Sequence, residues 1–252
     1  MKKIVSIMLL AVMSAALFSG CVSVNFNGLG VGVGLEVRGD GVPQVFEFSV
    51  GDISEIHVMS LCNVEYYASP SDVVTLEIQP NLLEYYIVEE SGGVLTIKSA
   101  VHGVRFVNVK TPVLTVGSSA LTHVSFQGAG NFTAHDTIRV DSFDFHLSGA
   151  GDADIDIDTD SFSSSLAGAG NLTLSGRADV ASFNLSGAGK VEALELQSRE
   201  ADVSLSGAGT VRISASEKLD VAASGVGSVE YRGSPASLNI QRSGVVTVRQ
   251  ID

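Results

Sequence analysis

One tripeptide recurs along the second half of the chain and restricts the possible folds more than any other feature. Gly-Ala-Gly occurs five times and then decays to Gly-Val-Gly and Gly-Val-Val, with 21, 19, 19, 20, 18 and 19 residues between successive first glycines. Such near-constant spacing indicates a repeat architecture, in which each copy is one structural unit. The first glycines of the seven copies are Gly128, Gly149, Gly168, Gly187, Gly207, Gly225 and Gly244.

The residues around the tripeptide show which unit is repeated. Two residues before and two residues after it the copies are mostly apolar, as at Leu166 and Leu172, whereas the first and third residues after it are polar. A period of two on both sides predicts two short strands joined by a tight corner. Glycine suits this corner if the backbone needs a positive φ or leaves no room for a side chain. The sequence therefore predicts an all-β fold, with a parallel β-solenoid of about 19-residue rungs over residues 121–252.

The first half carries strand patterns without the tripeptide. Residues 45–120 are rich in alternating or β-branched segments, and the stretch around Gly92-Gly93 has the pattern of a β-hairpin. The segment "NLLEYY" predicts a short turn rather than a long helix. Residues 21–44 are glycine-rich and are interpreted as a tether with one alternating strand at residues 31–37. The expected order is therefore tether, β-rich half and solenoid.

The N-terminus has the features of a bacterial secretory signal. Two lysines precede an apolar run of about 15 residues, which is shorter than the roughly 20 that a transmembrane helix needs. Ser-Gly-Cys at its end resembles a lipobox, so residues 1–20 are predicted to be a lipoprotein signal peptide and Cys21 the site of lipid attachment. An ordinary cleaved signal and an uncleaved anchor remain alternatives.

Charge excludes one class of partner. Without Lys2 and Lys3 the mature chain has 13 basic residues (15 − 2) against 28 acidic ones, a net charge of −15. This acidity argues against nucleic acid and against simple electrostatic adhesion to anionic lipids or sugars. If Cys21 is acylated, Cys62 is the only remaining thiol, and its alternation with Ile56, Val58 and Val64 predicts a buried, unreactive side chain.

Five aspartates occupy alternate positions from Asp152 to Asp160, directly after one corner. Ala153, Ile155 and Ile157 alternate with them, so the carboxylates are expected to face solvent. One strand cannot supply the several oxygens that calcium requires, and neighbouring rungs offer only Asn and Thr there. A solvated acidic face is therefore the preferred interpretation, with calcium binding as the alternative.

The histidines show no metal-ligand spacing, and no metal, cofactor or catalytic residue is predicted. They are His57, His102, His123, His135 and His146. When the copies are aligned on the tripeptide, His123 and Asp144 occupy the same position on adjacent rungs, as do Ser125 and His146. Together they would make a flat Ser/His/Asp patch. Nucleophilic catalysis also needs an oxyanion hole and a site that excludes water, so a polar ladder is the preferred interpretation.

The third position after the corner predicts a charge ladder. Glu192, Arg212, Glu230 and Arg249 alternate in sign on neighbouring rungs. Each pair, if exposed, is expected to contribute a few tenths of a kcal/mol.

Several segments together resemble a known family. They are "TPVLTVGSSALTHVSFQGAG", the repeated "SGAG" and the closing "GSVEYRGSPASLNIQRSG", preceded by the strand-rich half. Residues 45–251 are thereby similar to the auto-transporter adhesin head family, the GIN domain of bacterial secreted and lipid-anchored proteins. The resemblance implies a β-helix without catalytic residues and a role in cell adhesion.

Three functions remain open. The preferred hypothesis is a non-enzymatic, lipid-anchored envelope protein, at the outer membrane, whose solenoid faces bind a protein or glycan in adhesion or surface assembly. The alternatives are a protein that binds or cleaves polysaccharide, which rests on fold analogy alone, and a periplasmic structural protein. A second copy is one candidate partner, because the end rung at residues 246–251 would present an unpaired edge.

Overall fold

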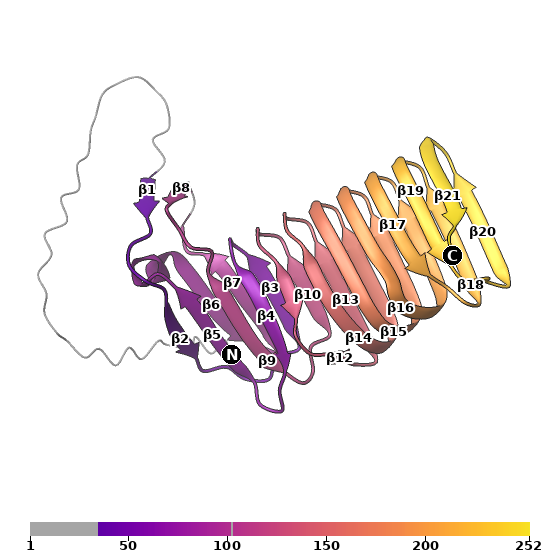
Figure 1. Ribbon diagram of the computed structural model, residues 1–252. Coiled ribbons are helices and arrows are strands. Elements are labelled where there is room, and N and C mark those ends of the chain that lie inside the picture. The colour runs from indigo at the N-terminus through magenta and orange to yellow at the C-terminus, as the bar shows by residue number, and fades with distance from the viewer. Residues whose placement is uncertain (1–34, 102) are drawn as a thin grey trace, which may run out of the picture.

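The second half of the chain is a parallel β-solenoid, as the repeat predicts. The computed structural model describes residues 35–101 and 103–252. Strands of successive turns pair in parallel and lie side by side along the stack (Figure 1). The solenoid strands are β10 (His123–Phe126), β11 (Phe132–Ala134), β12 (Ile138–Arg139), β13 (Ser142–Leu147), β14 (Ala153–Leu166), β15 (Ala169–Leu185), β16 (Ala188–Leu205), β17 (Ala208–Ser214), β18 (Lys218–Ala223), β19 (Val226–Arg232), β20 (Ser237–Arg242) and β21 (Val245–Gln250).

The register between rungs places equivalent residues of the repeat on top of one another. Leu166 pairs with Leu185 before the corner, and Ala169 pairs with Ala188 at the corner itself. Leu166 and Leu172 are both buried, so the apolar positions on the two sides of the corner face the same interior. The interior of the solenoid is therefore lined by continuous columns of apolar side chains.

The corner glycines are required because successive corners approach too closely for a side chain. A Cβ atom on Gly149 would lie 1.8 Å from the carbonyl oxygen of Gly128, and one on Gly168 would lie 1.9 Å from that of Gly149. Neither residue has a left-handed φ, so space alone excludes a side chain there. At Gly151 both reasons apply, because its φ is 153° and its Cβ would lie 1.7 Å from the oxygen of Gly130.

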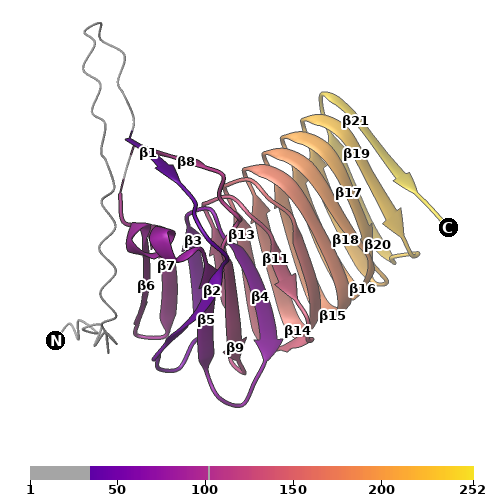
Figure 2. The same cartoon turned by 60° about the vertical axis from the view of Figure 1, so that its left-hand side comes forward.

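The first half is joined to the solenoid through one additional rung. β3 (Glu55–Met59) pairs in parallel with β10, and Leu61 bridges to Ala129. β4 (Asn63–Ala68) pairs with β11 and lies beside it (Figure 2). Residues 60–62 thus form a corner without glycine, and the solenoid begins inside the β-rich half. The elements of this half are β1 (Leu35–Arg38), β2 (Gln44–Phe48), β3 (Glu55–Met59), β4 (Asn63–Ala68), β5 (Val73–Ile78), η1 (Pro80–Tyr85), β6 (Tyr86–Ser91), β7 (Val94–Ser99), β8 (Val104–Val107) and β9 (Val113–Ser118).

Antiparallel strands close the N-terminal side of the stack. β7 and β9 pair in parallel with β3 and β4, although they come later in the chain. β6 pairs antiparallel with β7. β5 pairs antiparallel with β9, and β2 pairs antiparallel with β5. The predicted hairpin at Gly92-Gly93 and the predicted short turn, which is the 3₁₀ helix η1, are both present. At the opposite side, Leu238 and Ile240 on β20 are exposed, whereas their partners Leu219 and Val221 on β18 are buried.

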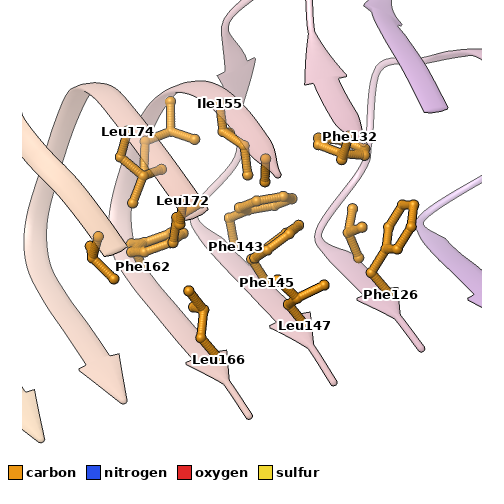
Figure 3. Packing of buried hydrophobic residues seen from close by; sticks show 14 of the residues in the cluster. Phe126, Phe132, Phe143, Phe145, Leu147, Ile155, Phe162, Leu166, Leu172 and Leu174 are labelled. Carbon is orange, nitrogen blue, oxygen red and sulfur yellow. The ribbon is translucent and has the colours of Figure 1, made fainter. Parts of the chain in front are cut away.

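Large and small side chains complement one another in the core. Phe162 lies between Phe143, at a ring-centroid distance of 6.3 Å, and Phe183, at 5.8 Å (Figure 3 shows the first pair). Ser164 points inward and pairs with Phe145 on one side and with Phe183 on the other. In the neighbouring column, Phe162 pairs with Ala181 on the next rung. A small residue therefore stands where the neighbouring ring needs space, which keeps the interior densely packed.

Cys62 is fully buried at its corner, as predicted. Removal from solvent raises the pKa of its thiol to about 12. Burial also raises the pKa of Tyr66 and of Tyr86 to about 12, and their hydroxyls donate hydrogen bonds to the carbonyl oxygens of Ser118 and Leu61. All three groups are therefore held in the neutral form in the folded protein.

We expect these neutral groups to make the fold sensitive to alkali. Since the thiol ionises near 8.5 in an unfolded chain and near 12 here, its stabilisation is present below pH 8.5 and is lost as the pH rises toward 12. When the pH is raised from 8 to 10.5, the free energy of unfolding should fall by about 2 kcal/mol less in Cys62→Ala than in wild type. Urea denaturation of both proteins at the two pH values measures this, and equal losses would contradict it.

Several expectations fall on residues outside the described part of the chain. These are the signal peptide at residues 1–20, the lipid attachment at Cys21 and the tether up to residue 34. Within the predicted strand at residues 31–37, the described part begins with β1, which pairs in parallel with β8. No helix in the described ranges has the length and apolar character needed to cross a membrane.

Candidate functional site

The outward face before the corner brings the predicted Ser/His/Asp patch together in register. His123 on β10 pairs with Asp144 on β13, and Ser125 pairs with His146. Ser125 is buried, however, and its hydroxyl oxygen accepts a hydrogen bond of 3.4 Å from the Gln127 side chain. The geometry gives a polar ladder in which the hydroxyl of Ser125 is hydrogen-bonded to Gln127.

The aspartates of β14 face outward, as predicted. Ala153, Ile155 and Ile157 are buried between them. Asp156 accepts a hydrogen bond of 2.8 Å from the Ser175 hydroxyl on the next rung. The strand thus contributes to the core with one side and forms an acidic ridge with the other.

Asp152 belongs to a ladder of amide side chains that the sequence did not reveal in full. The Asn63 side-chain oxygen accepts from the Asn131 amide, and the Asn131 oxygen accepts from the Asp152 amide, at 3.0 and 3.1 Å. One Asp152 oxygen then accepts from both the backbone and the side chain of Asn171, at 2.9 and 2.8 Å. This carboxylate is therefore used to hold neighbouring rungs in register.

The predicted charge ladder is present, with one difference. Arg212 donates to Glu230 at 2.7 Å and lies 3.4 Å from Glu192, while the Arg249 Nε donates to Glu230 at 3.0 Å. The Glu230 side chain is only 7% exposed, whereas a fully exposed ladder was expected. The hydrogen bonds from Arg249 and then Arg212 hold the pKa of the Glu230 carboxyl below its usual value, against the opposing effect of desolvation.

Glu230→Gln should therefore destabilise the fold more than the loss of an exposed pair. We expect a loss of about 1 kcal/mol at low salt, because one covered carboxylate serves two guanidinium groups. Glu217→Gln is the matched control, since Glu217 makes a two-point contact with Arg199 but both side chains are more than half exposed. Chemical denaturation at low and high salt compares them, and equal losses at low salt would contradict the prediction.

The depressed pKa of Glu230 also sets the sign of its pH dependence. Its stabilisation is present above the carboxyl pKa of the unfolded chain and is lost as the pH falls through the lower pKa of the folded protein. The difference between wild type and Glu230→Gln should accordingly shrink in acid.

The additional rung brings two further residues to the polar face before the corner. The alignment on the glycine tripeptide did not predict them there. Glu55 pairs with His123, and His57 pairs with Ser125. The Nε2 atom of His57 lies 3.3 Å from an Oε atom of Glu55, and the His57 and His123 rings meet edge to face at a centroid distance of 5.7 Å. In the described part of the chain, Glu55, His57 and His123 are the one group of three such side chains close enough to share a metal ion.

A signal for these residues was present in the sequence. Glu55 stands five residues before Ser60, as His123 stands five before Gly128, and Val58 then corresponds to Phe126. An alignment on the corner position rather than on glycine would have brought the two segments together.

An open hollow of about 780 Å³ adjoins this cluster. Glu55, His123 and Asp144 lie in its lining, with Thr122 and Ser142. The hollow is shallow and open to solvent, so a group bound here remains accessible from outside.

The match to a protein family follows the solenoid and its additional rung. The model of the family described as "Putative auto-transporter adhesin, head GIN domain" matches residues 52–235. The chain belongs to this family. The matched range of this GIN domain contains β3 and β4 as well as the glycine corners from Gly128 to Gly225, which confirms the predicted resemblance.

Solved structures share the fold of this GIN domain. A "putative adhesin" from Bacteroides fragilis is 24% identical, with a TM-score of 0.81 over 85% of this chain and 100% of that one. A "putative lipid binding protein" from Parabacteroides distasonis is 23% identical, with a TM-score of 0.68 over 86% and 100%. A "putative adhesin" from Parabacteroides merdae is 20% identical, with a TM-score of 0.66 over 86% and 99%. None of the curated proteins matches.

Proposed function

We propose that this GIN domain is a non-enzymatic, adhesin-like module of the bacterial cell envelope, anchored by a lipid on Cys21. The observation that carries the proposal is the pair of long outward faces, on which polar side chains follow the register from rung to rung. The asparagine ladder and the charge ladder ending at Arg249 are two such rows, and the acidic ridge of β14 runs along a single rung beside them. The description of the family as an adhesin head supports this proposal.

A rigid face suits binding through many weak contacts. The columns of buried side chains fix each strand, so groups on the face keep their spacing without a partner. Binding of a partner then costs little free energy for ordering the protein surface, because that surface is already ordered. Proteins or glycans that repeat along their length are the chemical class that such a ladder fits.

The test compares intact cells that differ only in this protein. On an array of glycans and matrix proteins, more cells with the wild-type chain should be retained than cells lacking it. Protease added outside the cells should abolish this difference in the number of retained cells. Cys21→Ala should release the protein from the membrane fraction and remove adhesion, while the purified variant still binds the same array ligand. Lys2→Ala, within the signal but away from the lipobox, serves as the processing control.

The alternatives predict different outcomes of the same experiment. Equal retention by cells with and without the protein would overturn the adhesion proposal. Full protection from protease on intact cells would favour a periplasmic structural protein. Turnover of a polysaccharide by the purified chain would favour an enzyme.

A further inference from the structure

We propose that Glu55, His57 and His123 form a binding site for a divalent transition metal of the zinc class on the outer face of the solenoid. Two neighbouring parallel strands hold the three side chains, β3 the first two and β10 the third. The site goes beyond the adhesin-like function, since none of the argument for that function uses it.

The spacing of the ligand atoms fits tetrahedral coordination. All three ligand atoms lie within 4.8 Å of one another, and His57 Nε2 is 3.3 Å from the Glu55 oxygen. Zinc binds nitrogen and carboxylate oxygen at about 2.0–2.2 Å, which places two ligands of a tetrahedron about 3.4 Å apart. The Glu55 and His57 atoms already have this spacing, and rotamer adjustments would bring the His123 nitrogen to a shared ion.

His57 supplies a second, independent observation. Its Nε2 atom is buried and has no hydrogen-bond partner, because the Glu55 oxygen lies outside hydrogen-bond geometry. A buried polar atom without a partner costs free energy, and such atoms are rare in folded proteins. A metal ion between Glu55 and His123 would give this nitrogen the partner that the protein does not provide.

The backbone around the cluster is fixed. Ile56 and Val58 alternate with Glu55 and His57 and are fully buried, as is Val124 beside His123. β7 covers the other edge of β3 in parallel register. The ligands therefore stand on strands whose positions are set by the core, which favours a preorganised site.

The donor set selects the class of metal. Two imidazoles and one carboxylate suit zinc and its neighbours, whereas calcium and magnesium prefer six or more oxygen ligands. Glu55 and His123 also line the open hollow, so the fourth position faces solvent and is available to water. Asp144, which pairs with His123 and lines the same hollow, stands next to that position.

The test is metal binding by the full chain after treatment with a chelator. We expect one equivalent of Zn²⁺ per chain by calorimetry, a visible Co²⁺ spectrum typical of four-coordinate nitrogen and oxygen ligands, and no binding of Ca²⁺ at the same concentration. His57→Ala and His123→Ala should each weaken Zn²⁺ binding by about 100-fold or more, and Glu55→Gln by about 10-fold or more.

His146→Ala is the matched control, because His146 lies on the same face two rungs beyond His57 without belonging to the cluster. It should bind Zn²⁺ as wild type does. Zn²⁺ should also raise the Tm of wild type and of His146→Ala but not of His57→Gln, which separates loss of the site from loss of the fold. Zn²⁺ binding that survives in the His57→Gln/His123→Gln double variant, or that is lost in His146→Ala, would overturn the proposal.

Discussion

Gly168→Ala should lower the free energy of unfolding by about 3 kcal/mol or more, although it adds only a single carbon atom. The new Cβ would lie 1.9 Å from the carbonyl oxygen of Gly149. That oxygen accepts the hydrogen bond from the Ala169 amide at 3.0 Å, so it cannot move without breaking the contact between rungs. The two corners would have to separate, and the parallel pairing on both sides would weaken with them.

Ala169→Ser is the control for this substitution. Ala169 is the next residue in the same corner, is exposed, and also gains one heavy atom. Its effect should stay within about 0.5 kcal/mol. Urea denaturation followed by circular dichroism measures both variants. Similar stabilities for the two would show that the corner can accept a side chain and that close stacking is not the reason for the repeated glycine.

Phe162→Ala should cost about 3–5 kcal/mol, because removing a buried ring that packs against two other rings leaves a cavity. Phe162 is 1% exposed and packs between the rings of Phe143 and Phe183. Its neighbours in the register cannot fill the space, since Ala181 on the next rung is small and the strands are held at a fixed spacing.

Ser163→Ala, at the exposed neighbouring position, should leave stability almost unchanged. Phe162→Leu should fall between the two, since part of the volume is kept. Thermal and urea denaturation measure all three variants. A loss below about 1 kcal/mol in Phe162→Ala would mean that the column collapses onto the gap and that the core is less tightly packed than the ring contacts indicate.

The repeat determined most of the solenoid from the sequence alone. Residues at a fixed offset from the corner must occupy the same place in every rung, so the inward direction of Leu166 and Leu172 and the outward direction of Asp154 followed from alternation. The same frame predicted the pairing of Arg212 with Glu230. The degree to which Glu230 is covered did not follow, because it depends on how two long arginine side chains lie across the rung.

Only the tertiary structure decided where the first half joins the stack. β3 lies between β7 and β10, and β4 lies between β9 and β11, so both neighbours of each strand come later in the chain. Its corner has Ser60 and Cys62 in place of the two glycines, which hid it from a search for the tripeptide.

The candidate metal site depends on that placement. Alternation along β3 puts Glu55 and His57 on one face, and this much is local and readable from the sequence. Their approach to His123 requires the pairing of β3 with β10, between residues 68 positions apart, and no periodicity fixes such a contact. The sequence therefore determined the repeating unit and its faces, because those follow from local alternation. The tertiary structure decided which side chains meet across the first rung, because that depends on the long-range order of the strands.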